Sequence, residues 1–167
     1  VVLQTATAYA TNPRTNALQP PRYLGGVEPP VTPDTDRRVD FARWLTTREN
    51  PYFARSVVNR FWSYFFHRGI IDPVDDLRTT NPPINPELLD ALADDFVKHK
   101  FDLKHMLRTI LNSRAYQLDS APTPGNSADA ANIHFTRYAT KRLTAEQLAD
   151  GIDQITGTRE KYIGLPL

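Results

Sequence analysis

The chain has 167 residues, 40% of them hydrophobic and 23% charged, which is enough for one domain with a sizeable hydrophobic core. Its formal net charge of +1 supplies no field to hold nucleic acid, and no window combines a basic stripe with aromatic residues. The absence of cysteine excludes disulfides, zinc–thiolate sites, covalent c-type haem and thiol catalysis, and no run of about 18 apolar residues predicts a transmembrane helix.

The N-terminal part, residues 1–35, is predicted to be an extended arm, because prolines and the Gly25-Gly26 pair interrupt any helix there. Val1–Tyr9 alternates loosely between apolar and polar residues and could form one short strand. The arm is expected to pack on the helical body, with a disordered tail as the alternative. The residues expected to make this contact are Tyr23, Leu24 and Val27. Residues 36–167 form the predicted helical domain, and the chain is interpreted as a fragment of a longer protein because it starts without a signal-like segment.

The first predicted helix runs from about Asp36 to Arg48. It follows Asp34 or Thr35, either of which can accept hydrogen bonds as an N-cap. Apolar residues recur along it at helical spacing, which predicts one buried side. That side comprises Val39, Phe41, Ala42, Trp44 and Leu45.

A second, central helix is predicted directly after Asn50, whose side chain can accept from the amides of the first turn. Pro51 suits the first helical position because its missing N–H costs nothing there, and Gly69 is expected to end the helix in a left-handed conformation. The apolar side chains cover an arc of about 220°, wider than on a surface helix, so the helix should be buried on more than one side. They are Phe53, Ala54, Val57, Val58, Phe61, Trp62, Phe65 and Phe66.

Polar side chains on the remaining face of the central helix, and in the loop after it, form the candidate site. They are Arg55, Asn59 and Arg60 on the helix, and Asp75, Asp76 and Arg78 in the loop. Because an unpaired buried charge is unfavourable, Arg55 or Arg60 is expected to pair with an aspartate of the Asp75-Asp76 dipeptide and tie the loop to the helix. Two interpretations stay open, a structural network or groups that line a binding cleft. No catalytic role is assigned to any of the six residues.

Two further helices are predicted after the loop. Asn85 and Pro86 repeat the Asn-Pro start of the central helix, and Asp102 caps a following helix that runs to about Arg114. Apolar residues at helical spacing predict an inner face for each helix. These faces comprise Leu88, Leu89, Leu92, Ala93, Phe96 and Val97 in the first, and Leu103, Met106, Leu107, Ile110 and Leu111 in the second.

Residues 119–131 are rich in Ser, Pro, Gly and Ala and predict an exposed, mobile loop. A last helix is expected to start with a capping box of Thr144 and Gln147 and to end at Gly157. Its predicted inner face consists of Leu143, Leu148, Ile152 and Ile155.

Together, the predicted helices indicate a mainly α fold. They are expected to form a compact bundle of about five helices around the central aromatic-rich helix, with an extended Pro-rich N-terminal arm.

No metal-binding or cofactor-binding residues are predicted. The four histidines are scattered, and His99 and His105 lie on either side of a predicted turn without a zinc-binding motif, so we interpret them as surface or capping residues. The acidic loop Asp72–Asp76 could hold a cation through backbone carbonyls, but it lacks the residue order of a calcium-binding loop. We therefore expect no metal and no cofactor in this chain.

Several collinear motifs resemble one known family. They read W-L-T-x-x-x-N-P-Y-F-A-R-x-x-V-N-R-x-W, R-G-I-I-x-P-V-D-D-L-R-x-x-N-P-P, P-E-L-L-D-x-L-A, F-D-L-K-H-M-L-R-T-I-L-N-S-R-A-Y-Q-L and R-L-T-A-E-Q-L-A-D. Over about residues 13–157 the chain is similar to a planctomycete-type C-terminal domain of unknown function, number fifteen fifty-three of that series. The resemblance implies a large exported bacterial protein, in the periplasm or at the cell surface, of a kind that often carries a cytochrome c-like domain.

The resemblance implies no reaction, and the motifs consist mainly of caps, turns and core positions. We therefore expect a non-catalytic helical binding or assembly module, whose partners are other domains of the same polypeptide or separate proteins. The alternative is part of a polysaccharide-processing or redox-coupled enzyme with its chemistry partly in upstream domains, in which case polysaccharide is the expected ligand. Neither nucleic-acid binding nor membrane insertion is expected.

Overall fold

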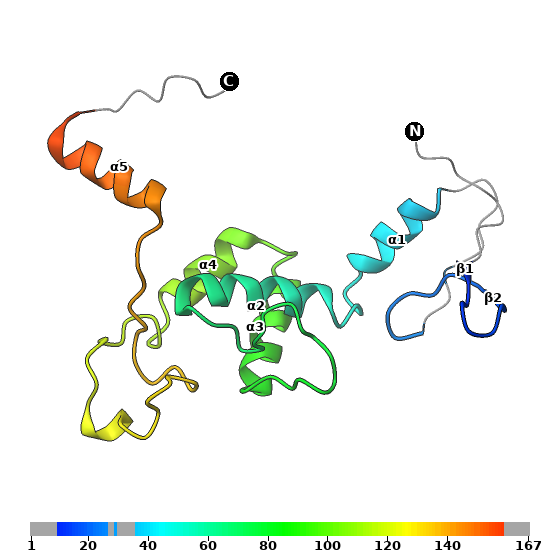
Figure 1. The fold of residues 1–167 in the computed structure, drawn as a ribbon, viewed down its shortest axis with the longest axis horizontal. Helices are drawn as coiled ribbons and strands as arrows, with labels where there is room; N and C mark the ends of the chain where they lie inside the picture. Colours follow the sequence, from blue (N-terminus) through cyan, green and yellow to red (C-terminus); the bar gives the residue numbers. More distant parts are fainter. Residues whose placement is uncertain (1–9, 27–28, 30–35, 159–167) are drawn as a thin grey trace.

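The computed structural model describes residues 10–26, 29 and 36–158, and this part of the chain is mainly helical, as predicted. It contains α1 (Arg37–Leu45), α2 (Phe53–Phe66), α3 (Pro86–Lys98), α4 (Leu103–Leu111), α5 (Ala145–Thr156), a 3-10 helix (Pro124–Asn126), and the antiparallel strands β1 (Ala10–Thr11) and β2 (Leu18–Gln19). Helices α2, α3 and α4 lie together at the centre, with α1 and the β-hairpin at one end and α5 at the other (Figure 1). Within the described ranges, no helix combines the length and apolar character that spanning a membrane would require.

The turn before α2 is built around Asn50, but α2 begins later than predicted, at Phe53, and Pro51 lies outside the helix. The Asn50 Oδ1 atom accepts hydrogen bonds from the N–H groups of Tyr52 and Phe53 at 2.9 and 3.0 Å, while its Nδ2 donates to the Trp44 carbonyl at 3.1 Å. The buried Asn50 side chain therefore joins the end of α1 to the start of α2. The far end of α2 differs from the prediction, because His67, with a φ of 70°, takes the left-handed position that was expected of Gly69.

The hydrophobic core lies where α2 packs against α3 and α4. Its fully buried residues include Ala54, Val58, Trp62, Phe66, Ile70, Ile71, Leu89, Ala93, Phe96, Met106 and Ile110. The rings of Trp62 and Phe66 are stacked with their centroids 4.0 Å apart. The other predicted apolar residues of α2 are partly buried around this centre, so the helix does bury a wide arc.

Helices α3 and α4 start at the predicted caps. The Asn85 side chain accepts from the Leu88 N–H at 3.0 Å, with Pro86 in the first turn, and the Asp102 side chain accepts from the His105 N–H at 3.2 Å. Helix α4 ends at Leu111, slightly earlier than predicted. The caps fix where each helix starts, and both helices pack against α2.

The turn between α3 and α4 is held by a partly buried aromatic side chain. Lys100 and Phe101 both adopt left-handed backbone conformations, with φ of 56° and 60°. The Phe101 ring packs edge-on against Phe53 and Phe96, with centroid distances of 5.6 and 5.4 Å. Since a left-handed conformation is unfavourable for a bulky residue, burial of this ring stabilises the turn.

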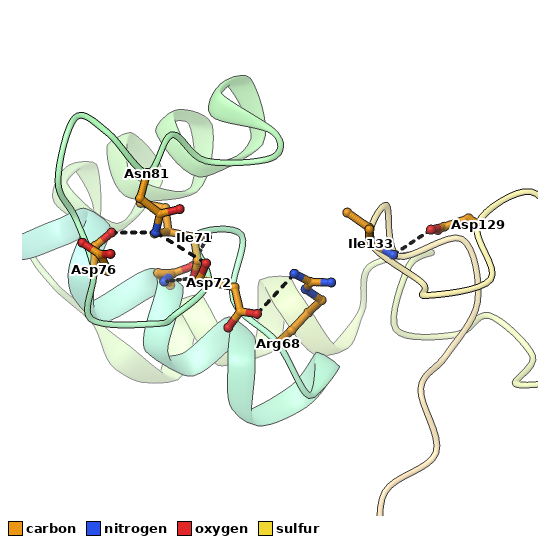
Figure 2. Close-up of polar contacts among 8 residues, drawn as sticks. Arg68, Ile71, Asp72, Asp76, Asn81, Asp129 and Ile133 are labelled. Carbon is orange, nitrogen blue, oxygen red and sulfur yellow. Dashed lines mark hydrogen bonds and ion pairs between the residues drawn. The ribbon is translucent and has the colours of Figure 1, made fainter.

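The segment after α4 carries a core residue that the sequence analysis did not identify. Phe135, with a φ of 55°, is buried and packs edge-on against Trp62 at a centroid distance of 5.2 Å. The Asp129 carboxylate organises this segment, because it accepts from the Ile133 N–H at 2.7 Å (Figure 2) and from the Thr136 hydroxyl at 3.0 Å. Partial burial raises the pKa of Asp129, but these bonds to its charged form outweigh that effect and lower the pKa.

The N-cap of α1 is Asp36, whose side chain accepts from the Arg38 N–H at 2.9 Å. The alternatives Asp34 and Thr35 lie outside the described residues. The predicted buried side of α1 is wrong, because Val39 and Phe41 are 42% and 48% exposed. Among the described residues α1 makes no extensive contact with another helix, so these side chains stay exposed although Tyr23 packs against Phe41.

The described part of the N-terminal arm contacts α1. The Tyr23 ring stacks on Trp44 with a centroid distance of 4.7 Å, so the arm is docked at this point as predicted. Leu24 was also expected to contact the helical body, but it is exposed, so this prediction is wrong. The third expected contact, Val27, lies outside the described residues, as does the strand expected at residues 1–9.

Helix α5 has the predicted ends but not the predicted burial. Thr144 and Gln147 form the reciprocal capping box, and Gly157 ends the helix with a φ of 69°. The expected inner face is exposed in this structure. Its residues Leu143, Leu148, Ile152 and Ile155 are 61%, 52%, 51% and 87% exposed.

Candidate functional site

The loop after α2 is held to the helix by the side chain of Asn59. This residue is 0% exposed, and its Nδ2 donates to the carbonyls of Ile71 and Val74 at 2.9 and 3.0 Å. Its Oδ1 accepts from the Ile71 N–H at 2.9 Å. One side chain thus satisfies the hydrogen bonds of three backbone groups of the loop. An apolar side chain at the same position of α2 would leave those groups without partners.

Gly69 allows the loop to approach Asn59 this closely. A Cβ atom added at Gly69 would lie 2.2 Å from the Ile71 carbonyl oxygen and 2.8 Å from both polar side-chain atoms of Asn59. Gly69 is therefore required by lack of space, and the left-handed cap expected of it is wrong. We name Asn59, Gly69, Ile71 and Val74 the loop clamp.

Charged side chains surround the loop clamp on its exposed side. Arg60 pairs with Asp75, which is one of the pairings that the sequence predicted, and this hydrogen bond raises the pKa of Arg60. Arg78 donates two hydrogen bonds of 2.6 Å to the carboxylate of Asp76 and so lowers the pKa of Asp76. Both pairs connect neighbouring surface groups, so they orient the loop more than they stabilise it.

Backbone carbonyls of the acidic loop also have partners. The Asn81 amide donates to the Asp76 carbonyl at 3.0 Å and lies 3.4 Å from that of Asp72, and Arg68 pairs with the Asp72 carboxylate at 3.2 Å (Figure 2). The carbonyls of Ile71 and Val74 accept from Asn59. In this structure the carbonyl oxygens of Asp72, Val74 and Asp76 therefore face side-chain amide donors.

Arg55 is separate from the other candidate residues. It pairs with Asp90 of α3, a partner that the sequence analysis did not identify. Both side chains line an open hollow of about 270 Å³ between the start of α2 and α3. The structure thus gathers Asn59, Arg60, Asp75, Asp76 and Arg78 around the loop, whereas Arg55, one turn before Asn59, pairs with α3.

The buried position of Asn59 could have been recognised from its spacing. Asn59 precedes Phe66 by two helical turns, so the two residues share a side of α2, although Asn59 was placed on the polar face. No comparable signal identifies Ile71 and Val74, because their contribution is made by backbone atoms.

A second polar cluster joins the end of α3 to the start of α4. It consists of Asp95, His99 and His105, whose potential metal-ligating atoms all lie within 4.8 Å of one another. The two imidazole rings stack with their centroids 3.6 Å apart. The sequence analysis set these histidines aside because the turn separates them, and the fold brings them together.

Comparison with known proteins identifies one relationship. A family model described as "PSD1: Protein of unknown function (DUF1553)" matches residues 37–166, which is most of the chain. No curated protein and no solved structure matches.

Proposed function

The chain belongs to the PSD1 family (DUF1553), and from this premise we propose that it is a non-catalytic helical module that works by binding or assembly. On the resemblance of its motifs, we place it in a large protein that is exported to the periplasm or the cell surface. Its partners in this proposal are other domains of the same polypeptide or separate proteins. The uncovered apolar side of α5 is the observation that carries the proposal.

Helix α5 has an exposed apolar side. Leu148, Ile152 and Ile155 follow one another at helical spacing, and each is at least 51% exposed. A helix of 12 residues is marginal in water when nothing covers its apolar side. Clustered exposed apolar residues of this kind are typical of interaction surfaces. We therefore infer that α5 is completed by an apolar protein surface.

The central loop supports a structural role for its own polar residues. Arg60 and Asp75 pair with each other, as do Arg78 and Asp76, and the polar atoms of Asn59 are bonded to backbone. Groups already paired in this way would have to exchange their partners for a substrate. The structural network is therefore the interpretation we favour over a catalytic cleft.

Hydrogen exchange of α5 tests the binding proposal. In the isolated chain we expect fast exchange of the α5 amides, and in the natural full-length polypeptide we expect slow exchange, because the partner surface covers Ile152 and its neighbours. Ile152→Glu should restore fast exchange by placing a charge in the contact. Gln154→Glu adds the same charge on the polar side of α5 and should leave the protection intact. Equal exchange of α5 in both proteins would exclude the other domains of the same polypeptide as the partner.

The enzyme alternative makes a different prediction. If the loop is a polysaccharide site, a neutral or sulfated polysaccharide should raise the melting temperature of the wild-type chain but not of Arg60→Ala or Asp75→Ala. Our proposal predicts the same melting temperature with and without each polysaccharide, because these two residues hold the loop and not a ligand. A thermal-shift series on the three proteins distinguishes the two functions.

A further inference from the structure

The polar cluster at the α3–α4 corner has the arrangement of a metal site. Asp95 lies in the last turn of α3, His99 directly follows that helix, and His105 lies in the first turn of α4. One carboxylate oxygen of Asp95 lies 3.2 Å from His99 Nδ1, and the other lies 2.8 Å from His105 Nε2. The carboxylate therefore connects the two imidazoles.

We propose that Asp95, His99 and His105 bind a divalent transition-metal ion of the Zn²⁺ type. Two imidazole nitrogens and one carboxylate oxygen suit Zn²⁺, Co²⁺ or Ni²⁺, whereas Ca²⁺ and Mg²⁺ prefer oxygen ligands alone. Bonds of about 2.0–2.2 Å in a tetrahedral site place the ligand atoms about 3.3–3.6 Å from one another. The distance of 3.2 Å between Asp95 and His99 is close to this range, whereas the 2.8 Å contact between Asp95 and His105 must lengthen and the stacked imidazole rings must turn apart to admit the ion.

The surrounding fold holds the three ligands in place and leaves them accessible. Asp102 accepts a hydrogen bond from the His105 backbone N–H at 3.2 Å, whereas His99 Nδ1 lies 2.9 Å from the Asp95 carbonyl and must give up that contact, with its proton, to bind the ion. The turn between them is anchored by the Phe101 ring, which packs against Phe53 and Phe96. The side chains of the three ligands are 34–40% exposed, so an ion can reach them from solvent.

A metal ion at this position would link two helices of the core. It would bind the folded corner and not the unfolded chain, so it would stabilise the α3–α4 turn. Three protein ligands leave a fourth position for water or for a donor from a partner. This role goes beyond the binding module proposed above, and it departs from the sequence-based expectation that the chain binds no metal.

Titration of the untagged chain with Zn²⁺ alone tests the proposal. We expect calorimetry to show one ion per chain and a higher melting temperature with Zn²⁺, while Co²⁺ should give visible absorption bands of a low-symmetry site. His99→Ala and His105→Ala should each weaken binding by about tenfold or more. His67→Asn is the matched control, because it removes an exposed histidine at a left-handed position that Asn tolerates, and it should bind as the wild type does.

Two results would overturn the proposal. One is the absence of Zn²⁺ binding to a wild-type chain that melts cooperatively. The other is binding that is unchanged in the folded His99→Ala and His105→Ala variants, because the ion would then be held elsewhere. Circular dichroism of each variant establishes that it is folded. Asp95→Asn, which keeps the size of the side chain but removes its charge, provides a third variant whose binding should also fall.

Discussion

Asn59→Ala is expected to lower the free energy of unfolding by about 3 kcal/mol or more, because it leaves two buried backbone groups and one partly buried group of the loop without partners. Those groups are the N–H and carbonyl of Ile71 and the carbonyl of Val74. Each unsatisfied buried group costs about 1–3 kcal/mol, so the loss exceeds that of the net hydrogen bonds alone. Urea unfolding of the purified chain, monitored by circular dichroism, measures this loss of free energy.

Two further variants separate this effect from others at the same site. Arg60→Ala removes an exposed ion pair next to Asn59 and should leave the urea midpoint unchanged within error. Asn59→Asp keeps the shape of the side chain but replaces its donor with an acceptor, so it should be strongly destabilising as well. A loss for Asn59→Ala no larger than that for Arg60→Ala would show that the loop clamp is not the main attachment of the loop.

Gly69→Ala should destabilise the chain by about 3 kcal/mol, because the new methyl group has no space. Its carbon would lie 2.2 Å from the Ile71 carbonyl oxygen, which is backbone and cannot rotate away. The loop must then move off α2 and stretch the bonds to Asn59. Thermal and urea unfolding of the variant measure the loss.

Gly151→Ala is the matched control for this substitution. Gly151 lies within α5, and a Cβ atom there would meet no atom within 4 Å. Since alanine favours a helix over glycine by up to about 1 kcal/mol, this variant should lose no stability. The double variant Asn59→Ala, Gly69→Ala should lose less than the sum of the single losses, because both disrupt the same clamp. Additive losses would contradict a shared mechanism.

Glycine and histidine at the end of α2 show one limit of sequence reasoning. Gly69 was predicted to adopt a left-handed conformation, and His67 adopts it in its place. Glycine is used both for positive φ and for close approach of other atoms, and the sequence does not distinguish these uses. At Gly69 the close approach involves Asn59 and Ile71, which reach it only after the loop has folded back.

Sequence also left the burial of amphipathic helices undecided. The pattern of α5 predicted an apolar side correctly, but not that Ile152 and Ile155 would face solvent in this structure. The same holds for Phe41 on α1. Amphipathic spacing shows which residues share a side, whereas burial depends on another element that covers that side.

By itself the sequence determined the family, the mainly helical class and the starts of α3, α4 and α5. Caps such as Asn85 and Asp102 are decided locally, because the backbone groups that they bind lie within three residues along the chain. Tertiary structure alone decided that Asn59 binds the loop and that His99 meets His105. Such contacts join segments that approach only when the core packs, and their free energy therefore depends on the whole fold.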